Sequence, residues 1–271
     1  MNLQNTTKIS VYVKNIYTII VLFFLSIPIF VSVAVGFGDD KVARFPPRSL
    51  SLEWFKLAID NPTFINALIN SMVLAFLTTI ATIIISLPAT LALVKHKFPY
   101  QPTLEAYLLS PLSLPGVLYG MSMLIFLGEF DLGLPSWALL ISHIVIALPY
   151  ALRTTLVIYR SSDRSLEEVG MVLGANHWQT FLYITLPMLK PGIVAGGLFA
   201  FLISFDNVPV SIFLTTSNNV TLPVAIMSYL VGQNFDASIG AISAIQVSVV
   251  LVLLYILDRF YGINQLKSFG S

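Results

Sequence analysis

Long apolar runs without a charged residue are the feature that most constrains how this chain can fold. The segments Asn15 to Gly38 and Asn61 to Val94 contain no Asp, Glu, Lys or Arg. A membrane helix needs roughly 20 predominantly apolar residues, so each run is long enough to cross a bilayer. The whole chain is 56% hydrophobic and 10% charged, whereas soluble domains are about 25% charged. The sequence therefore predicts an all-α polytopic membrane protein.

Six apolar runs predict six transmembrane helices, and the fifth is the one that contains a charged residue, Asp206. They are Asn15–Gly38, Asn61–Val94, Ala106–Gly128, Leu132–Leu152, Pro191–Leu214 and Ala237–Leu257. Another apolar run, Val220 to Val231, is too short to cross and predicts a re-entrant or surface helix. Lysines precede the first span as in a signal peptide, but its apolar run exceeds the usual 7–15 residues, which predicts an uncleaved anchor.

The distribution of Lys and Arg predicts the orientation in the membrane. If the N-terminus is cytoplasmic, only four of the fourteen Lys and Arg residues face outside, namely Lys41, Arg44, Arg48 and Lys56. Cytoplasmic loops carry an excess of Lys and Arg in membrane proteins. Both termini, and the polar loop between the fourth and fifth spans, are therefore predicted to be cytoplasmic.

That polar loop, LEEVGMVLGANHWQTFLYITLPMLK, predicts an amphipathic helix. Apolar residues at helical spacing form one stripe; they are Val169, Val172, Leu173, Trp178, Phe181 and Leu182. Asp163 or Ser165 could cap the helix start, and Gly174 with Ala175 indicates a break or the close approach of another backbone. From these residues alone, a helix lying on the inner leaflet remains an alternative.

The loop resembles the cytoplasmic signature of permease subunits of binding-protein-dependent ATP-binding-cassette importers. That signature has Glu-Ala-Ala, a Gly six residues after the Glu, and Ile-x-Leu-Pro starting ten residues after the Gly. The corresponding residues here are Glu168, Gly174, Ile184, Leu186 and Pro187. Val169 and Gly170 stand where the signature has two alanines, and the resemblance covers roughly residues 66–255.

The resemblance implies a type I importer permease fold in a bacterial inner membrane. Residues 1–63 would be an N-terminal span and external loop, and 64–260 a five-span core with a coupling loop at 159–190. Residues 261–271 would form a cytoplasmic tail. The coupling helix would sit in a groove of the ATPase, with Gly170 and Gly174 allowing close packing. Glu168 would pair with a basic residue of the ATPase, or cap its own helix.

The resemblance also implies partners, because the chain lacks the parts to drive transport itself. No Gly-x-x-x-x-Gly-Lys-Ser/Thr phosphate loop occurs, so ATP would be used by two ATPase subunits and the chain would not be an enzyme. An external solute-binding protein and a second permease, homologous or identical, would complete the importer. The three histidines offer no metal spacing, and the net charge of +1 gives no reason to expect nucleic acid.

Two ionisable residues fall inside predicted spans, where such residues are functional candidates. His143 has the alternative of a neutral imidazole bonded to a neighbouring helix. Asp206, followed by Asn207 and Pro209, is expected to face the translocation pathway, in a helix that Pro209 would kink. This segment resembles the spermidine/putrescine branch, which implies a polyamine or similar cation as solute. A structural role for Asp206 is the alternative.

A secondary transporter or channel that works without ATP is the competing function. Such proteins often contain matching broken helices in two repeated halves. No convincing internal repeat relates the predicted spans, so the sequence favours the importer subunit.

Overall fold

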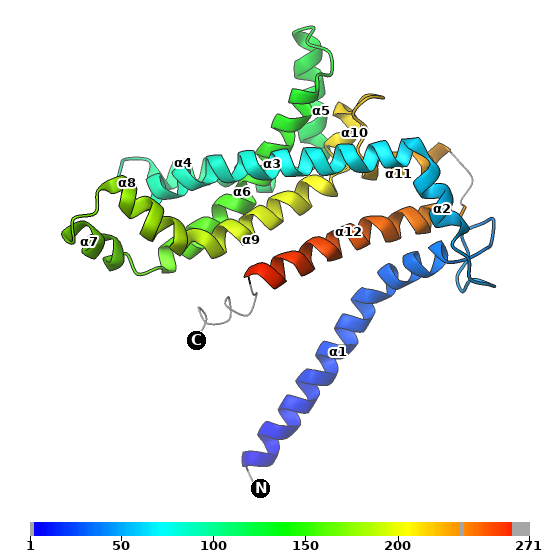
Figure 1. Ribbon diagram of the computed structural model, residues 1–271, viewed down its shortest axis with the longest axis horizontal. Helices are drawn as coiled ribbons and strands as arrows, with labels where there is room; N and C mark the ends of the chain where they lie inside the picture. Colours follow the sequence, from blue (N-terminus) through cyan, green and yellow to red (C-terminus); the bar gives the residue numbers. More distant parts are fainter. Residues whose placement is uncertain (1–2, 233–235, 262–271) are drawn as a thin grey trace. The chain divides into compact units, whose positions relative to one another are not determined.

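The computed structural model describes residues 3–232 and 236–261, and most of them are helical (Figure 1). The all-α prediction is confirmed. The longer helices are α1 (Leu3–Gly36), α3 (Pro62–Lys95), α5 (Gly116–Glu129), α6 (Ser136–Ser161), α9 (Leu186–Phe205) and α12 (Ser238–Tyr261). The shorter ones are α2 (Glu53–Asp60), α4 (Gln101–Leu109), η1 (Ser110–Ser113), α7 (Ser165–Val172), α8 (His177–Thr180), η2 (Phe181–Thr185), α10 (Ser211–Leu214) and α11 (Leu222–Gly232). The predicted tail is 261–271; after Tyr261, the last residue of α12, it lies outside the described residues.

Five of the described helical segments are long and apolar enough to cross a membrane. They are Lys14–Gly36, Pro62–Lys95, Ser136–Ser161, His177–Phe205 and Ser238–Arg259. A sixth crossing is formed if α4 with η1 and α5 count as one broken span. The prediction of six spans therefore agrees with the structure on that count.

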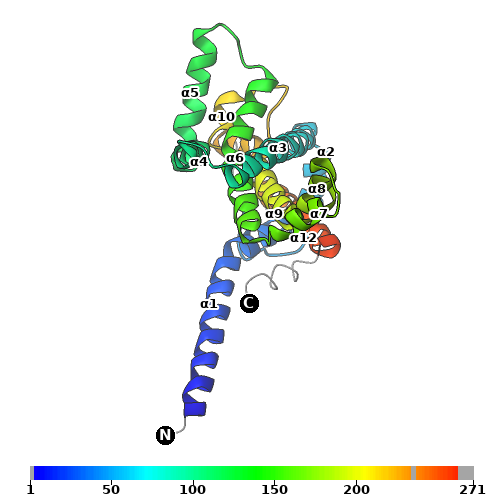
Figure 2. The same cartoon turned by 90° about the vertical axis from the view of Figure 1, so that its left-hand side faces the viewer.

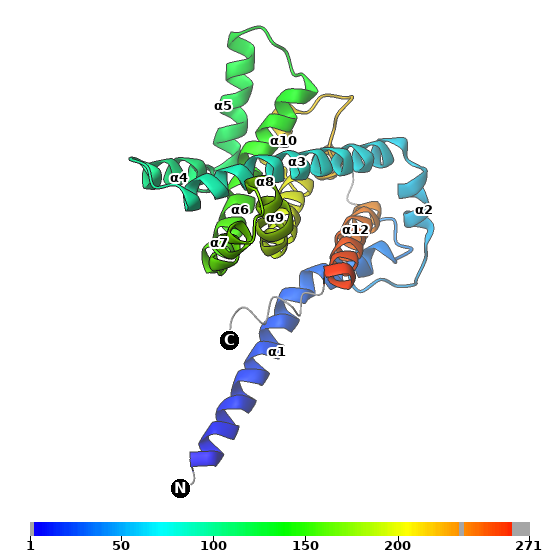
Figure 3. The ribbon, with the colours of Figure 1, turned by 60° about the vertical axis from the view of Figure 1, so that its left-hand side comes forward.

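The predicted third span, Ala106 to Gly128, is wrong as a single helix. The helices on either side of residue 114 are bent by 99°, and α5 turns away from α4 in Figure 3. Leu114 has an extended backbone (φ −87°, ψ 128°) because it precedes Pro115, whose ring disfavours the helical conformation there. Pro111 lies in the preceding 3-10 turn.

The described residues form two compact units, one from 3–65, 228–232 and 236–251, the other from 66–227 and 252–261. In the first unit the end of α1 meets the start of α12 at two glycines. A Cβ on Gly36 would come within 2.6 Å of the backbone of Ala241, and one on Gly240 would meet Gly36 in turn. The predicted domain division at residues 63 and 64 remains a prediction.

Helices α6 and α9 pack closely in the second unit, side by side in Figures 1 and 2. Gly192 and Gly196 of α9 face Thr155 and Ala151 of α6, and a Cβ on Gly196 would lie 3.0 Å from the Cα of Ala151. Small residues spaced by four let membrane helices approach closely in this way. This contact holds the helix that follows the polar loop against the helix that precedes it.

A stripe of small polar residues lies along the buried side of α3. Its members are Ser71, Thr78, Thr82, Ser86 and Thr90. The Oγ1 atoms of Thr90 and Thr155 are 2.7 Å apart, which bonds α3 to α6. Hydrogen bonds between polar side chains hold helices together where lipid cannot solvate them, so the second unit has a core of helices α3, α6 and α9.

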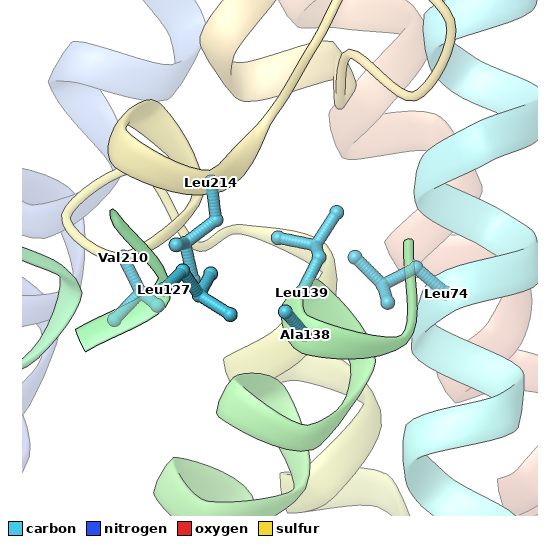
Figure 4. Packing of buried hydrophobic residues seen from close by; sticks show 6 residues of the cluster. All are labelled: Leu74, Leu127, Ala138, Leu139, Val210 and Leu214. Carbon is cyan, nitrogen blue, oxygen red and sulfur yellow. The ribbon is translucent and has the colours of Figure 1, made fainter. Parts of the chain in front are cut away.

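A separate apolar cluster lies where α5, α6 and α10 meet (Figure 4). Its buried members are Leu74, Leu127, Ala138, Leu139, Val210 and Leu214. Helix α5 approaches the segment before α10 closely, since a Cβ on Gly120 would lie 3.0 Å from the Cα of Val210. The cluster fixes the segment that follows α9.

Helix α11 has eleven residues, which rise about 16 Å and cannot cross a hydrocarbon core of about 30 Å. The length of the helix supports the prediction that this run does not span. Its first turn is buried, and the backbone N–H of Leu222 donates to the Ser71 hydroxyl at 2.8 Å. The helix is therefore anchored by its first turn to α3, rather than lying freely on a surface.

Candidate functional site

The polar loop begins with a short helix, α7, whose start is fixed by an acid. The backbone N–H of Ser165 donates to Oδ1 of Asp163 at 3.0 Å. Hydrogen bonds from the side chain and backbone of Ser165 lower the pKa of the Asp163 carboxyl. Of the two predicted capping residues, Asp163 is therefore the one that accepts.

Helix α7 ends at Val172, before Gly174. The N–H of Ala175 donates to the carbonyl of Gly170, and the N–H of Gly174 to that of Met171. This pair of bonds is a Schellman motif, which needs a left-handed residue after the helix. Gly174 supplies it with φ +96°. The predicted break is confirmed. Nothing in this chain lies within 4 Å of a Cβ built at Gly174, and close packing of Gly174 against the ATPase stays a prediction.

A capping box starts α8. Asn176 and Gln179 exchange two bonds, each from the backbone N–H of one to the side-chain oxygen of the other, both at 2.9 Å. The chain then forms one π-helical turn, η2, before α9. Pro187 at the start of α9 has no N–H to donate, and π turns commonly occur where a regular helix is interrupted. The Ile-x-Leu-Pro part of the signature therefore marks the change from η2 to α9.

Glu167 on α7 is the centre of a buried polar cluster, with a relative exposure of 6%. Its Oε2 lies 2.7 Å from Nζ of Lys95, at the end of α3. Its Oε1 accepts hydrogen bonds from Tyr159 of α6 at 2.8 Å and Thr185 of η2 at 2.6 Å. One carboxylate thus joins α7 to three other elements.

The electrostatics of this cluster favour a charged Glu167. Burial alone raises the pKa of its carboxyl, but the hydrogen bonds of Lys95, Thr185 and Tyr159, with the charge of Lys95, outweigh burial and hold the pKa below its usual value. The Lys95 ammonium also lies 5.9 Å from the centre of the Tyr159 ring. Charged partners and hydrogen bonds are what a buried carboxylate requires.

Two positions of the signature meet at the buried side of α7. A Cβ on Gly170 would fall on Cδ1 of Ile184, so the isoleucine occupies the space that the glycine leaves open. Gly170 lies three residues after Glu167 and hence on the same helix face. Gly170 thus packs closely against the chain's own Ile184, and its packing against an ATPase surface stays a prediction.

The other face of α7 is exposed. Val172 and Leu173 have relative exposures of 86% and 82%. Exposed beside them are Glu168, Val169 and Trp178. Most of the predicted apolar stripe is thus exposed, and it is divided among α7, α8 and η2 rather than carried by one helix. Phe181, in η2, is the member that is half-buried.

Sequence reasoning chose Glu168 and missed its buried neighbour Glu167 with its three partners. The signature includes Glu168 but not Glu167. In the sequence, Lys95 counts only as one of the basic residues that predict the orientation in the membrane. The spacing of Glu167 and Gly170 would have placed the acid on the packed face. Leu186 and Pro187 lie at the start of α9, as expected of the end of the signature.

The predicted fifth span is wrong in its bounds. A continuous helical segment runs from His177 to Phe205, so Asp206 follows the last helical residue and is exposed. Helix α9 ends before Pro209 instead of being kinked by it. Oδ1 of Asn207 accepts from the N–H of Val210 at 3.0 Å, which starts a turn, and Pro209 has no N–H with which to continue the helix.

Pro209 packs on α5, since a Cβ on Gly116 would lie 3.0 Å from its Cβ. Asp206, Asn207 and Pro209 therefore form the connection between α9 and α10, not the middle of a span. The predicted span begins at Pro191, yet α9 begins at Leu186 and includes Lys190.

His143 bridges this connection. Its Nδ1 lies 2.8 Å from the hydroxyl of Ser204 on α9, and its Nε2 lies 2.9 Å from that of Ser211 on α10. The imidazole is fully buried. The interpretation of His143 as a residue bonded to neighbouring helices is confirmed. Among the described residues no group of three His, Cys, Asp or Glu could hold a metal ion.

Comparison with known proteins identifies relatives along most of the chain. The spermidine/putrescine transport system permease protein PotC of Haemophilus influenzae is 29% identical over 244 residues, covering 90% of this chain and 94% of that protein. The putrescine transport system permease protein PotI of Escherichia coli is 26% identical and covers 86% and 85%. The trehalose transport system permease protein SugB of Mycobacterium tuberculosis is also 26% identical, covering 75% of each chain.

Solved structures show the same fold. A bacterial ABC transporter involved in the import of the acidic polysaccharide alginate matches with a TM-score of 0.71 at 14% identity, covering 94% of this chain and 98% of that one. An amino acid ABC transporter matches with a TM-score of 0.60 at 17% identity, covering 78% and 98%. These likenesses confirm the type I importer permease fold.

The profile of one family, described as binding-protein-dependent transport system inner membrane component, matches residues 83–267. That range contains α6, the polar loop, α9 and the connection at Asp206. Taken with the apolar spans, it indicates a multi-pass protein of the inner membrane. This chain belongs to the family of inner membrane permease components of binding-protein-dependent ABC importers.

Proposed function

We propose that this chain forms half of the translocation pathway of an ATP-driven importer and that α7 and α8 are its docking surface for an ATPase subunit. The partners are two ATPase subunits, a second and homologous permease, and an external solute-binding protein. ATP is bound and used by the ATPase subunits. Family membership favours this function over a transporter that works without ATP.

The observation that carries this proposal is the exposed apolar face of α7 and α8. Large apolar side chains that protrude from a polar loop mark an interaction site. Val172 and Leu173 protrude furthest, and Glu168 beside them supplies a charge for a basic residue of the partner. The buried contacts of Glu167 and Gly170 on the opposite face hold this surface in a fixed orientation.

The proposed solute is a polyamine or a similar small cation. The relatives PotC and PotI are named for spermidine and putrescine transport, while the trehalose permease shows that similar identity accompanies a different solute. Asp206, the acid at the end of α9, is therefore a separate argument for a cationic solute. A carboxylate beside the pathway lowers the energy of a passing cation.

In the proposed orientation both termini are cytoplasmic. Helix α9 then runs outward, and its helical segment from His177 to Phe205 has 29 residues. Those residues rise about 43 Å, more than the ~30 Å hydrocarbon core. Asp206 would lie near the external end of the pathway, where a solute arrives from the binding protein.

The docking surface is tested by co-purification of the tagged permease with its ATPase. Leu173→Asp places a charge on the most exposed apolar face and should remove most of the ATPase from the complex. Val42→Glu is the control, since Val42 is also an apolar, exposed residue and lies in the predicted external loop. Undiminished ATPase association of the Leu173→Asp variant would contradict the docking role.

A further inference from the structure

We propose that Glu167 and Lys95, with Thr185 and Tyr159, form a latch that transmits movement of the docking surface to α3, α6 and α9. The proposal rests on the proposed function, because it assigns a role to residues behind the docking surface rather than on it. Glu167 is therefore a positioning residue. It touches neither the solute nor the exposed face of α7.

In the latch, the single carboxylate of Glu167 connects α7 to three other elements. Both oxygens of Glu167 are used, Oε2 by Lys95 at 2.7 Å and Oε1 by the hydroxyls of Tyr159 and Thr185. Those three partners lie on the end of α3, the end of α6 and the turn before α9. Because the bonds diverge from one group, α7 cannot shift without pulling on all three elements.

Apolar packing alone would hold α7 weakly. The helix has eight residues, and its apolar side chains Val169, Val172 and Leu173 are exposed rather than packed. On the buried side the contact of Gly170 with Ile184 fills space but is not directional. The charged hydrogen bonds of Glu167 are directional and roughly twice as strong as neutral ones. They are therefore the stiffest link between α7 and the spans.

Burial of the Glu167 carboxylate, which is 6% exposed, makes the latch sensitive to the loss of Lys95, whose own side chain keeps 31% of its surface exposed. Removing the Lys95 charge would leave the buried carboxylate uncompensated, which is strongly unfavourable. The link is thus either intact or broken, as expected of a part that transmits motion. The exposed pair of Arg160 and Glu105, bonded at 2.6 and 3.0 Å, joins α6 to α4 and does not involve α7.

The test measures coupling, defined as solute taken up per ATP hydrolysed, in proteoliposomes of the complete importer. Glu167→Gln keeps the shape of the side chain but removes the charge that pairs with Lys95. We expect it to retain the ATPase in the complex and to lower coupling about five-fold or more, the lower range of allosteric coupling energies. Glu105→Gln is the matched control and should keep the coupling of the parent.

A second pair of variants covers the case in which Glu167→Gln does not accumulate in the membrane. Thr185→Val removes one hydroxyl donor to Glu167, whereas Thr185→Ser keeps it. We expect reduced coupling in the first and restored coupling in the second. A role in stability alone would lower the amount of complex without changing uptake per ATP.

Parental coupling in Glu167→Gln, or in Thr185→Val if the first variant is not obtained, would overturn the latch. Loss of the ATPase from the Glu167→Gln complex would also overturn it, because the residue would then serve docking. A different result would show that the proposed function itself is wrong. In that case the parent chain itself would not associate with an ATPase, and neither would uptake depend on ATP.

Discussion

Cδ1 of Ile184 occupies the position that a Cβ on Gly170 would take. This contact links two positions of the signature that are fourteen residues apart, and it explains why a small residue is required at position 170. The atom concerned is the free end of a flexible side chain, so a methyl group could displace it at little cost. A larger side chain could not be accommodated in the same way.

We therefore predict that Gly170→Ala is tolerated, whereas Gly170→Leu destabilises the protein by about 1–3 kcal/mol, the usual cost of overpacking. Thermal unfolding of the permease in detergent measures the difference. The double variant Gly170→Leu/Ile184→Ala should recover part of the loss, because it removes the clashing side chain. Equal melting temperatures for Gly170→Leu and the parent would disprove the contact.

Gly174 has a different requirement, its φ of +96°. Gly174→Ala should cost about 1–2 kcal/mol in the isolated permease, since a Cβ disfavours the left-handed conformation. Gly174→Asn should cost less, because Asn enters this region more readily than other residues. Thermal unfolding of the three proteins tests the order.

Size at position 174 should matter only in the complex. Nothing lies within 4 Å of a Cβ there, so Gly174→Trp should destabilise the isolated permease no more than Gly174→Ala. If the glycine faces the ATPase, Trp should additionally weaken ATPase association and coupled uptake. Identical behaviour of the two variants in the complex would leave backbone conformation as the whole reason for glycine.

The sequence was sufficient to predict the fold class, most spans and the polar loop, because apolar runs and a spaced signature depend only on local residues. It was not sufficient to place helix ends. The predicted fifth span begins after Lys190, whereas α9 includes this lysine, because a helix can continue past a lysine whose long side chain reaches the interface. Helix α9 also ends earlier than expected; the Asn207 side chain bonds the backbone of Val210 in a turn, and Pro209 has no N–H with which to continue the helix.

The signature also could not predict which of two adjacent acids is buried. Glu167 and Glu168 differ in which side of α7 they occupy, and that depends on where α3, α6 and η2 lie. The bend at Leu114 did have a local signal, since Pro111 and Pro115 stand within the predicted third span. A proline disfavours helix at the residue before it, so the run should have been divided there.

The ion pair of the latch predicts how stability responds to pH. Because the folded protein holds the pKa of Glu167 below its usual value, the carboxylate stabilises the fold fully above the unfolded value of about 4.3. That contribution is lost as the pH falls through the lower folded value. The parent should therefore exceed Glu167→Gln in melting temperature at pH 7, by a margin that shrinks below about pH 4. A margin independent of pH would contradict the ion pair.

Labelling from one side of the membrane tests the position of α11. The chain contains no cysteine, so single cysteines can be introduced without background. Ser217→Cys and Gly232→Cys lie on exposed residues on either side of α11, and nothing lies within 4 Å of a Cβ at Gly232. Both should react with an impermeant maleimide from outside. Labelling of the two from opposite sides would show that this segment crosses the bilayer.

The last prediction concerns Asp206. If the solute is a cation, Asp206→Asn should lower uptake because it removes the negative charge while keeping the size of the side chain. A charge pair 4 Å apart is worth from about 1 kcal/mol in water to about 4 kcal/mol at a protein surface. A loss of about ten-fold, equivalent to about 1.4 kcal/mol, is therefore expected.

Uptake of radiolabelled putrescine into proteoliposomes, with ATPase association measured in parallel, separates the two roles considered for Asp206. Glu129→Gln is the control, since Glu129 is another exposed acid, at the end of α5, and is expected to lie on the same side. If the Asp206→Asn variant takes up solute as fast as the parent, the charge of Asp206 has no role in translocation. Failure of that variant to assemble would instead give Asp206 a structural role in the connection between α9 and α10, where Asn207 and Pro209 already fix the chain.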